Sequence, residues 1–266
     1  MNEVSLSQKL QKMYENYYER DSCKYQHKCM EDLCDKRIKF CCDRVKLGEQ
    51  YGKDPNIPKI VCVGLEGIHD KCGNKVIKGI SLPSDEAWNP HYKGVRYVLA
   101  YLLCSFENKE KPKNSRKNTL IEYQDTISQY ALTNCYKCAF GKPTTDRGLE
   151  HSKAMQRNCQ EILFNEIDIL QPDILIIQIV NNKPINFWKN IVTRYGGSEK
   201  LVKGDGNKNN TSVYELKYNS GKPFLVVWTY HGAWLRFHGE EYLKQKLNPV
   251  LEAVLEKLKE YGFKVD

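Results

Sequence analysis

Three polar side chains stand at or just beyond the ends of apolar runs that are typical of buried strands. Glu66 lies two residues after a run that stops at a glycine, Asn134 lies in a second run, and His231 follows a third. The carboxyl ends of parallel strands meet at one edge of a sheet, where open α/β folds bind their ligands. A carboxylate, a carboxamide and an imidazole gathered there would supply an anion, a paired donor and acceptor, and a ring N–H.

Each of these residues also has a purely structural interpretation. A glutamate in this place can cap a following helix, an asparagine at a strand end can cap a turn, and a lone histidine on a strand is more often structural. His69 and Asp70 lie close enough to Glu66 in the sequence to compete for its role. The three residues are therefore informative chiefly as an ordered set.

The segments that would position them alternate between strands and helices. Strands are predicted at residues 59–64, 130–140, 173–180 and 222–234, the last with its loop, and helices at 1–20, 92–106, 152–170 and 241–261. Loops are predicted at 107–118 and 196–210. This alternation predicts a three-layer α/β/α fold with a central, mostly parallel sheet.

The length of 266 residues fits one main domain at 58–266, with an N-terminal helix and Cys-rich segment at 1–57 packed on it. No apolar run approaches the ~20 residues that span a bilayer, and the N-terminus resembles an amphipathic helix more than a signal peptide. We therefore expect a cytoplasmic protein, without a membrane partner and monomeric.

Charge favours a polyanionic partner. The formal net charge is +8, from 41 Lys and Arg residues against 33 Asp and Glu. The basic stretch 107–118 could bind phosphate, although such a run is more often a solvated loop.

The eleven cysteines all lie between Cys23 and Cys159. In a reducing compartment, cysteines are more often metal ligands or buried thiols than disulfides. Four of them are expected to be buried as small apolar side chains: Cys62, Cys72, Cys104 and Cys135.

In their order along the chain, these motifs resemble those of the uracil-DNA glycosylase superfamily. The matching stretches are VGLEG around Glu66, LTNCYKC around Asn134, and YHGAWLR, which holds His231 and Arg236 with Gly and Ala in place of the superfamily's Pro and Ser. The resemblance covers about residues 34–245. It implies a glycosylase-like fold, DNA as partner, and a monofunctional enzyme that flips out a base and hydrolyses its N-glycosidic bond.

The resemblance also implies roles for single residues. Glu66 would orient a water and stabilise positive charge on the sugar, His231 would hydrogen-bond the departing base, and Asn134 would read the Watson–Crick edge. Glu66 stands where other members have Asp or Asn, and Leu65 stands where the cluster-bearing branches have Glu. Further implied contacts are Gly64, Leu65, Trp88 and Tyr92 for the substrate, and Trp234 and Arg236 for DNA.

The cluster-bearing branches of the superfamily hold a [4Fe–4S] cluster, which the resemblance implies here. Cys138 and Cys159 match the two ligands that follow the second motif. The upstream C-x-x-C pair is missing; Cys34 and Cys42 are the expected replacements, with Cys23, Cys29 and Cys41 as the alternatives. Four thiolates also suit zinc, so zinc is the alternative occupant.

Departures from the superfamily's motifs bear on the substrate. The Pro of the first motif and the base-stacking Phe motif are missing, which favours a modified pyrimidine over strict selectivity for uracil. The modified base could be a hypermodified cytosine of phage DNA, so repair and antiphage defence are both open. The alternatives are a non-catalytic nucleic-acid-binding protein of the same fold with an iron–sulfur or zinc site, and a zinc-stabilised interaction module.

Overall fold

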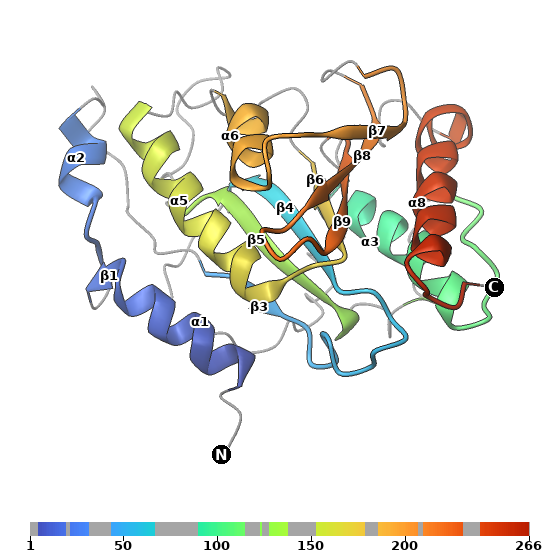
Figure 1. The fold of residues 1–266 in the computed structure, drawn as a ribbon, viewed down its shortest axis with the longest axis horizontal. Coiled ribbons are helices and arrows are strands. Elements are labelled where there is room, and N and C mark those ends of the chain that lie inside the picture. The colour runs from blue at the N-terminus through green and yellow to red at the C-terminus, as the bar shows by residue number, and fades with distance from the viewer. Residues whose placement is uncertain are drawn as a thin grey trace.

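The computed structural model shows a mixed α/β architecture, which confirms the predicted class (Figure 1). The residues that it describes are 5–19, 22–31, 44–66, 90–114, 123, 128–137, 153–178, 186–206, 210–230 and 240–265. A seven-stranded sheet with the order β3-β5-β4-β6-β9-β8-β7 lies between two groups of helices.

Four parallel strands form the middle of the sheet. In spatial order they are β5 (Tyr130–Tyr136), β4 (Ile60–Glu66), β6 (Ile174–Ile177) and β9 (Pro223–Trp228). Their sequences are almost continuously apolar because both faces are covered by helices, and all four residues of β6 are buried.

Both edges of the sheet pair antiparallel, so the sheet is mixed, whereas its four central strands run parallel as expected. β3 (Lys46–Leu47) pairs with β5 at one edge, and β8 (Ser212–Lys217) and β7 (Lys200–Lys203) extend the other edge beyond β9. β7 lies within the stretch 196–210, which was expected to be a loop. An edge strand with three exposed residues lacks the apolar pattern of a buried strand, so its sequence reads as a loop.

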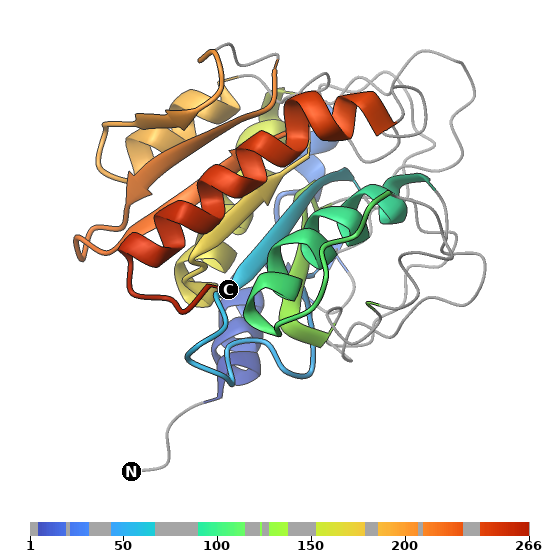
Figure 2. The ribbon, with the colours of Figure 1, turned by 90° about the vertical axis from the view of Figure 1, so that its right-hand side faces the viewer.

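The helices form the two outer layers. α1 (Leu6–Glu15), α5 (Lys153–Leu170) and α6 (Phe187–Arg194) share a core with one face of the sheet. α3 (Pro90–Leu103) and α8 (Asn248–Glu260) share a second core with the other face, which Figure 2 views from the front. The described part of the chain contains no helix with the length and apolar character needed to cross a bilayer.

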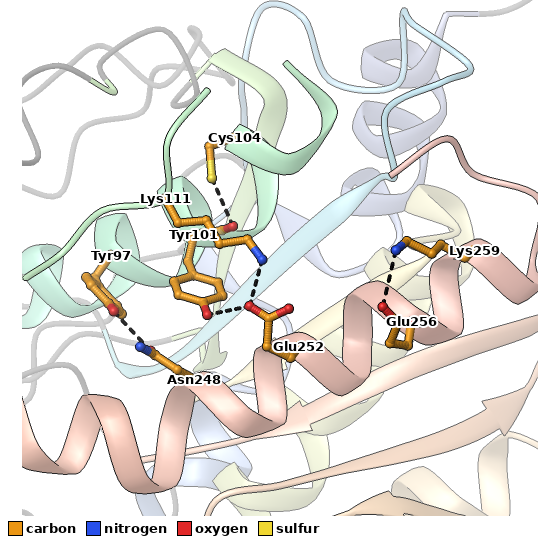
Figure 3. A network of polar contacts seen from close by, with 8 residues as sticks. All are labelled: Tyr97, Tyr101, Cys104, Lys111, Asn248, Glu252, Glu256 and Lys259. Carbon is orange, nitrogen blue, oxygen red and sulfur yellow. Dashed lines mark hydrogen bonds and ion pairs between the residues drawn. The ribbon is translucent and has the colours of Figure 1, made fainter. Parts of the chain in front are cut away.

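Polar contacts join α3, the loop after it, and α8 (Figure 3). Lys111 and the Tyr101 hydroxyl both donate to Glu252 Oε1, at 2.6 and 2.5 Å. Burial would raise the pKa of Glu252, but these hydrogen bonds outweigh it and lower that pKa. Part of the basic stretch 107–118 is therefore attached to the protein, and the interpretation of the whole stretch as a solvated loop is too simple.

The N-terminal segment joins the main core before residue 57. α1 and α2 (Gln26–Glu31) both contact α5, and β3 adds a strand to the main sheet. A two-residue ribbon of β1 (Tyr18–Glu19) and β2 (Ser22–Cys23) connects the two helices. The predicted domain boundary stays a prediction, but no separate core precedes it in the described residues.

Candidate functional site

The order of the parallel strands places a switch point at β4. The chain passes from β4 to β5 on one side of it and then crosses to β6 on the other side. Where neighbouring connections leave in opposite directions, the carboxyl ends of the strands open a crevice that binds ligands in folds of this kind. β4 carries Glu66 at its carboxyl end, so the predicted catalytic residue belongs to the strand at the switch point.

β4 and β5 bring two of the predicted motifs together. Gly64 lies directly opposite Asn134, and Glu66 lies opposite Tyr136, the next pair along that side of the strands. The first strand was expected to stop at Gly64, but it runs through Leu65 to Glu66 because β5 continues beside it. Gly64 has no side chain, so β4 presents only its backbone opposite the half-buried Asn134.

The third motif also begins at the carboxyl ends of the parallel strands. The backbone N–H of Thr229, just after β9, donates to the carbonyl of Ile177 at the end of β6, at 2.9 Å. The described chain continues to Tyr230, and His231 is the next residue.

The other predicted contacts are placed only in part. Tyr92 belongs to the first turn of α3, and its side chain lies outside the description. Predicted site residues that lie outside the described residues altogether are Trp88, His231, Trp234, Arg236, and the expected cluster ligands Cys34 and Cys42. Cys138 also lies outside, directly after the described Lys137.

A buried polar network that was not predicted involves Thr133 and Lys137, which the alternation of side chains along β5 places on the opposite face of the strand from Asn134. The side chains of Lys137 and Glu166 are 0% exposed, and Lys137 Nζ lies 2.6 Å from Glu166 Oε2. Thr133 donates to the same oxygen at 2.6 Å, and the Tyr14 hydroxyl donates to Oε1 at 2.5 Å. Burial raises the pKa of Glu166, against the opposing effects of Lys137 and both hydroxyls.

This network fixes the carboxyl end of β5. It joins β5 to α5 and, through Tyr14, to α1. The Tyr14 hydroxyl also accepts a hydrogen bond from the N–H of Val45 at 2.7 Å. One sequence signal could have revealed it. Glu166 stands on the buried stripe of α5, among Ile162, Leu163, Ile167 and Leu170, where an unpaired carboxylate would be very costly.

Three buried cysteines gather beside this network. They come from β2, α2 and α5 and are Cys23, Cys29 and Cys159. Burial is the main cause that raises the pKa of Cys23 to about 11, and the thiols of Cys159 and Cys29 add to it. The backbone N–H of Lys137 donates to Cys159 Sγ at 3.3 Å, and Asn158 Nδ2 donates to Cys29 Sγ at 3.4 Å.

These cysteines suit a thiolate-bound cluster in their chemistry. Within the described ranges, no three His, Cys, Asp or Glu side chains converge closely enough to hold a metal ion. However, Cys138 follows Lys137 directly, so a fourth cysteine is adjacent in sequence to the residue that donates to Cys159. N–H donors to sulfur are among the contacts that tune iron–sulfur sites.

Other cysteines are buried as apolar side chains, as predicted. Cys62 and Cys104 belong to the core on the opposite face of the sheet, and Cys135 is also buried. Cys72 lies outside the described residues. Because Cys62 lies on the opposite side of the sheet from Cys159, it provides an internal control for metal binding.

No model of a protein family matches this chain, and no curated protein matches it either.

Proposed function

We propose that the protein is a monofunctional DNA glycosylase with a fold of the uracil-DNA glycosylase type. The observation that carries this proposal is the pairing of β4 with β5, which sets Gly64 opposite Asn134 and places Glu66 at the same edge of the sheet. That edge is where open α/β sheets bind ligands. The formal net charge of +8 supports a polyanionic partner.

The chemistry of this site suits cleavage of an N-glycosidic bond. Positive charge develops on the sugar and negative charge on the leaving base, so the reaction needs an anion near C1′ and a donor near the base. Glu66 supplies the anion and orients a water, His231 donates to the base, and Asn134 pairs with the flipped edge. The proposed substrate is uracil or, favoured by the altered first motif, a modified pyrimidine.

Formation of abasic sites tests the proposal directly. Duplex and single-stranded DNAs that carry uracil or a series of modified cytosines are incubated with the protein, and alkali then reveals abasic sites as strand breaks. We expect breaks on at least one of these DNAs and none without alkali. DNA binding without breaks on any substrate would favour the non-catalytic alternative.

Asn134→Ala should blur the choice among bases. A pair of hydrogen bonds to a base edge contributes about 1–3 kcal/mol of discrimination, which this variant deletes. The measurement is the ratio of single-turnover rates on two DNAs that carry different pyrimidines. Asn248→Ala is the matched control, because Asn248 is a half-buried amide at the start of α8 whose Oδ1 accepts from the Tyr97 hydroxyl of α3 at 3.0 Å. An equal loss of rate on both bases would contradict the assigned role.

We also propose that the protein carries a [4Fe–4S] cluster held by Cys138, Cys159 and two upstream cysteines. The expected upstream pair is Cys34 and Cys42, with Cys23, Cys29 and Cys41 as the alternatives, since Cys23, Cys29 and Cys159 by themselves do not converge closely enough to hold a metal ion. When bound, the cluster would tie the N-terminal segment to α5 and to the end of β5, next to Asn134.

Iron content distinguishes the ligands. Cys138→Ser and Cys159→Ser should each lose most of the iron and the broad visible absorbance, because four-thiolate sites weaken sharply when one ligand is removed. Cys62→Ala should keep both. Loss of iron from Cys34→Ser and Cys42→Ser, with retention in Cys23→Ser and Cys29→Ser, is expected for the upstream pair, and the reverse result would assign Cys23 and Cys29 instead. Stoichiometric zinc without iron would refute the cluster.

A further inference from the structure

A groove of about 580 Å³ lies beyond the carboxyl end of β9. The ends of β7 and β8 form one side of it, and the residues that lead into α8 form the other. It therefore opens at the end of the sheet where the parallel strands have their carboxyl termini, which is also where Glu66 and Asn134 lie. From β4 to β8 the sheet order spans three strand spacings, roughly 14 Å.

Two lysines line this groove from opposite sides. Lys203 comes from β7 and Lys246 from the residues before α8, and both are exposed. Among the described residues neither ammonium forms an ion pair, whereas Lys257 and Lys111 are each paired with glutamates. Lysines that keep their charge uncompensated on two sides of a groove attract an anionic ligand.

Tyrosines and amides give the groove a defined polar lining. The Tyr230 hydroxyl donates to Asn210 Oδ1 at 3.3 Å, and Asn210 Nδ2 donates to Asp205 at 2.6 Å. The Tyr230 ring lies edge-on to that of Tyr242, with centroids 5.8 Å apart. Asp205 is the acidic side chain of the lining, and its carboxylate is engaged by Asn210.

The second side of the groove is a π-helical turn, Leu243–Leu247. Pro249 follows it; a proline has no N–H to donate, and in a regular α-helix its ring would clash with the carbonyl of Gln245, four residues earlier. The wider turn accommodates this proline and carries Gln245 and Lys246 at the groove. Turns of this type are frequent at functional sites.

We infer that this groove binds the sugar–phosphate backbone of the DNA strand next to the flipped nucleotide. Lys203 and Lys246 contact phosphates, and Tyr230 provides an aromatic surface for a neighbouring sugar or base. This inference rests on the proposed function, because it uses DNA as the ligand. The groove would be a second DNA contact, on the far side of β9 from the reaction site. The first is the contact expected from Arg236.

Salt dependence of binding provides the test. Affinity for unmodified single-stranded and duplex oligonucleotides is measured by fluorescence anisotropy over a range of salt concentrations. For Lys203→Gln/Lys246→Gln, the slope of log K against log [salt] should become shallower by roughly 0.7 per lost contact on single strands and 0.9 on duplex. The control Lys200→Gln/Lys244→Gln removes two exposed lysines from the same elements, outside the groove lining, and should change the slope much less.

The aromatic contact is tested separately with the same oligonucleotides. Tyr230→Leu should weaken single-stranded binding by about fivefold or more, because stacking on an aromatic ring contributes about 1–3 kcal/mol per base, whereas Tyr230→Phe should bind as wild type. Equal effects of the two lysine pairs, or wild-type slope and affinity in Lys203→Gln/Lys246→Gln, would overturn the groove while leaving abasic-site formation intact. A wild-type protein that binds no DNA would overturn the proposed function together with the groove.

Discussion

Glu66→Gln is expected to lower the single-turnover rate of base release by about 10²- to 10³-fold while affinity for DNA stays nearly unchanged. The carboxylate stabilises charge that exists chiefly in the transition state, so its loss affects the chemical step and not ground-state binding. The measurement combines single-turnover rates on substrate DNA with anisotropy titrations. Glu49→Gln, an exposed glutamate before β4, is the control and should keep the wild-type rate.

His231→Ala separates the two charges of the reaction. It should also lower the rate with little change in affinity, but by acting on the leaving base. The loss of rate should therefore be smaller for a base that departs easily as an anion than for a poor leaving group. Glu66→Gln should show no such dependence on the leaving group. Near-wild-type rates for both variants would refute the assigned site and transfer its roles to Asp70 and His69.

Lys137→Met is expected to lower the free energy of unfolding by about 3–5 kcal/mol. It leaves the carboxylate of Glu166 in a fully buried site without its cation, and this uncompensated charge is more costly than the lost contact itself. The double variant Lys137→Met/Glu166→Met removes both charges and should recover much of the stability. Urea unfolding measures all three proteins.

An exposed ion pair gives the contrast. Lys113 and Glu110 lie 3.0 Å apart with side chains 78% and 76% exposed, so Lys113→Met should change stability very little. A Lys137→Met protein as stable as wild type, or a double variant no better than the single one, would show that the buried pair does not anchor β5.

Much of the fold was readable from local patterns. The apolar runs that became β4, β5, β6 and β9 and the periodic segments that became α3 and α5 form where they were predicted, because burial on one face or both leaves a regular apolar spacing. The burial of Cys62, Cys104 and Cys135 was also predictable, since each stands in such a segment. The edge strand β7 and the short helix α6 were missed because a short or exposed element leaves a weaker pattern, and β8 was missed although most of its residues are buried.

The sequence by itself determined the α/β class, the main core segments and the order of the candidate motifs. Only the tertiary structure decided that β4 lies at the switch point, that Gly64 faces Asn134, and that Cys23 and Cys29 lie near Cys159. The tertiary structure alone also decided that Lys137 pairs with Glu166. The physical reason is that periodicity records which face of an element is buried, whereas strand order and contacts between distant residues depend on how whole elements pack against one another.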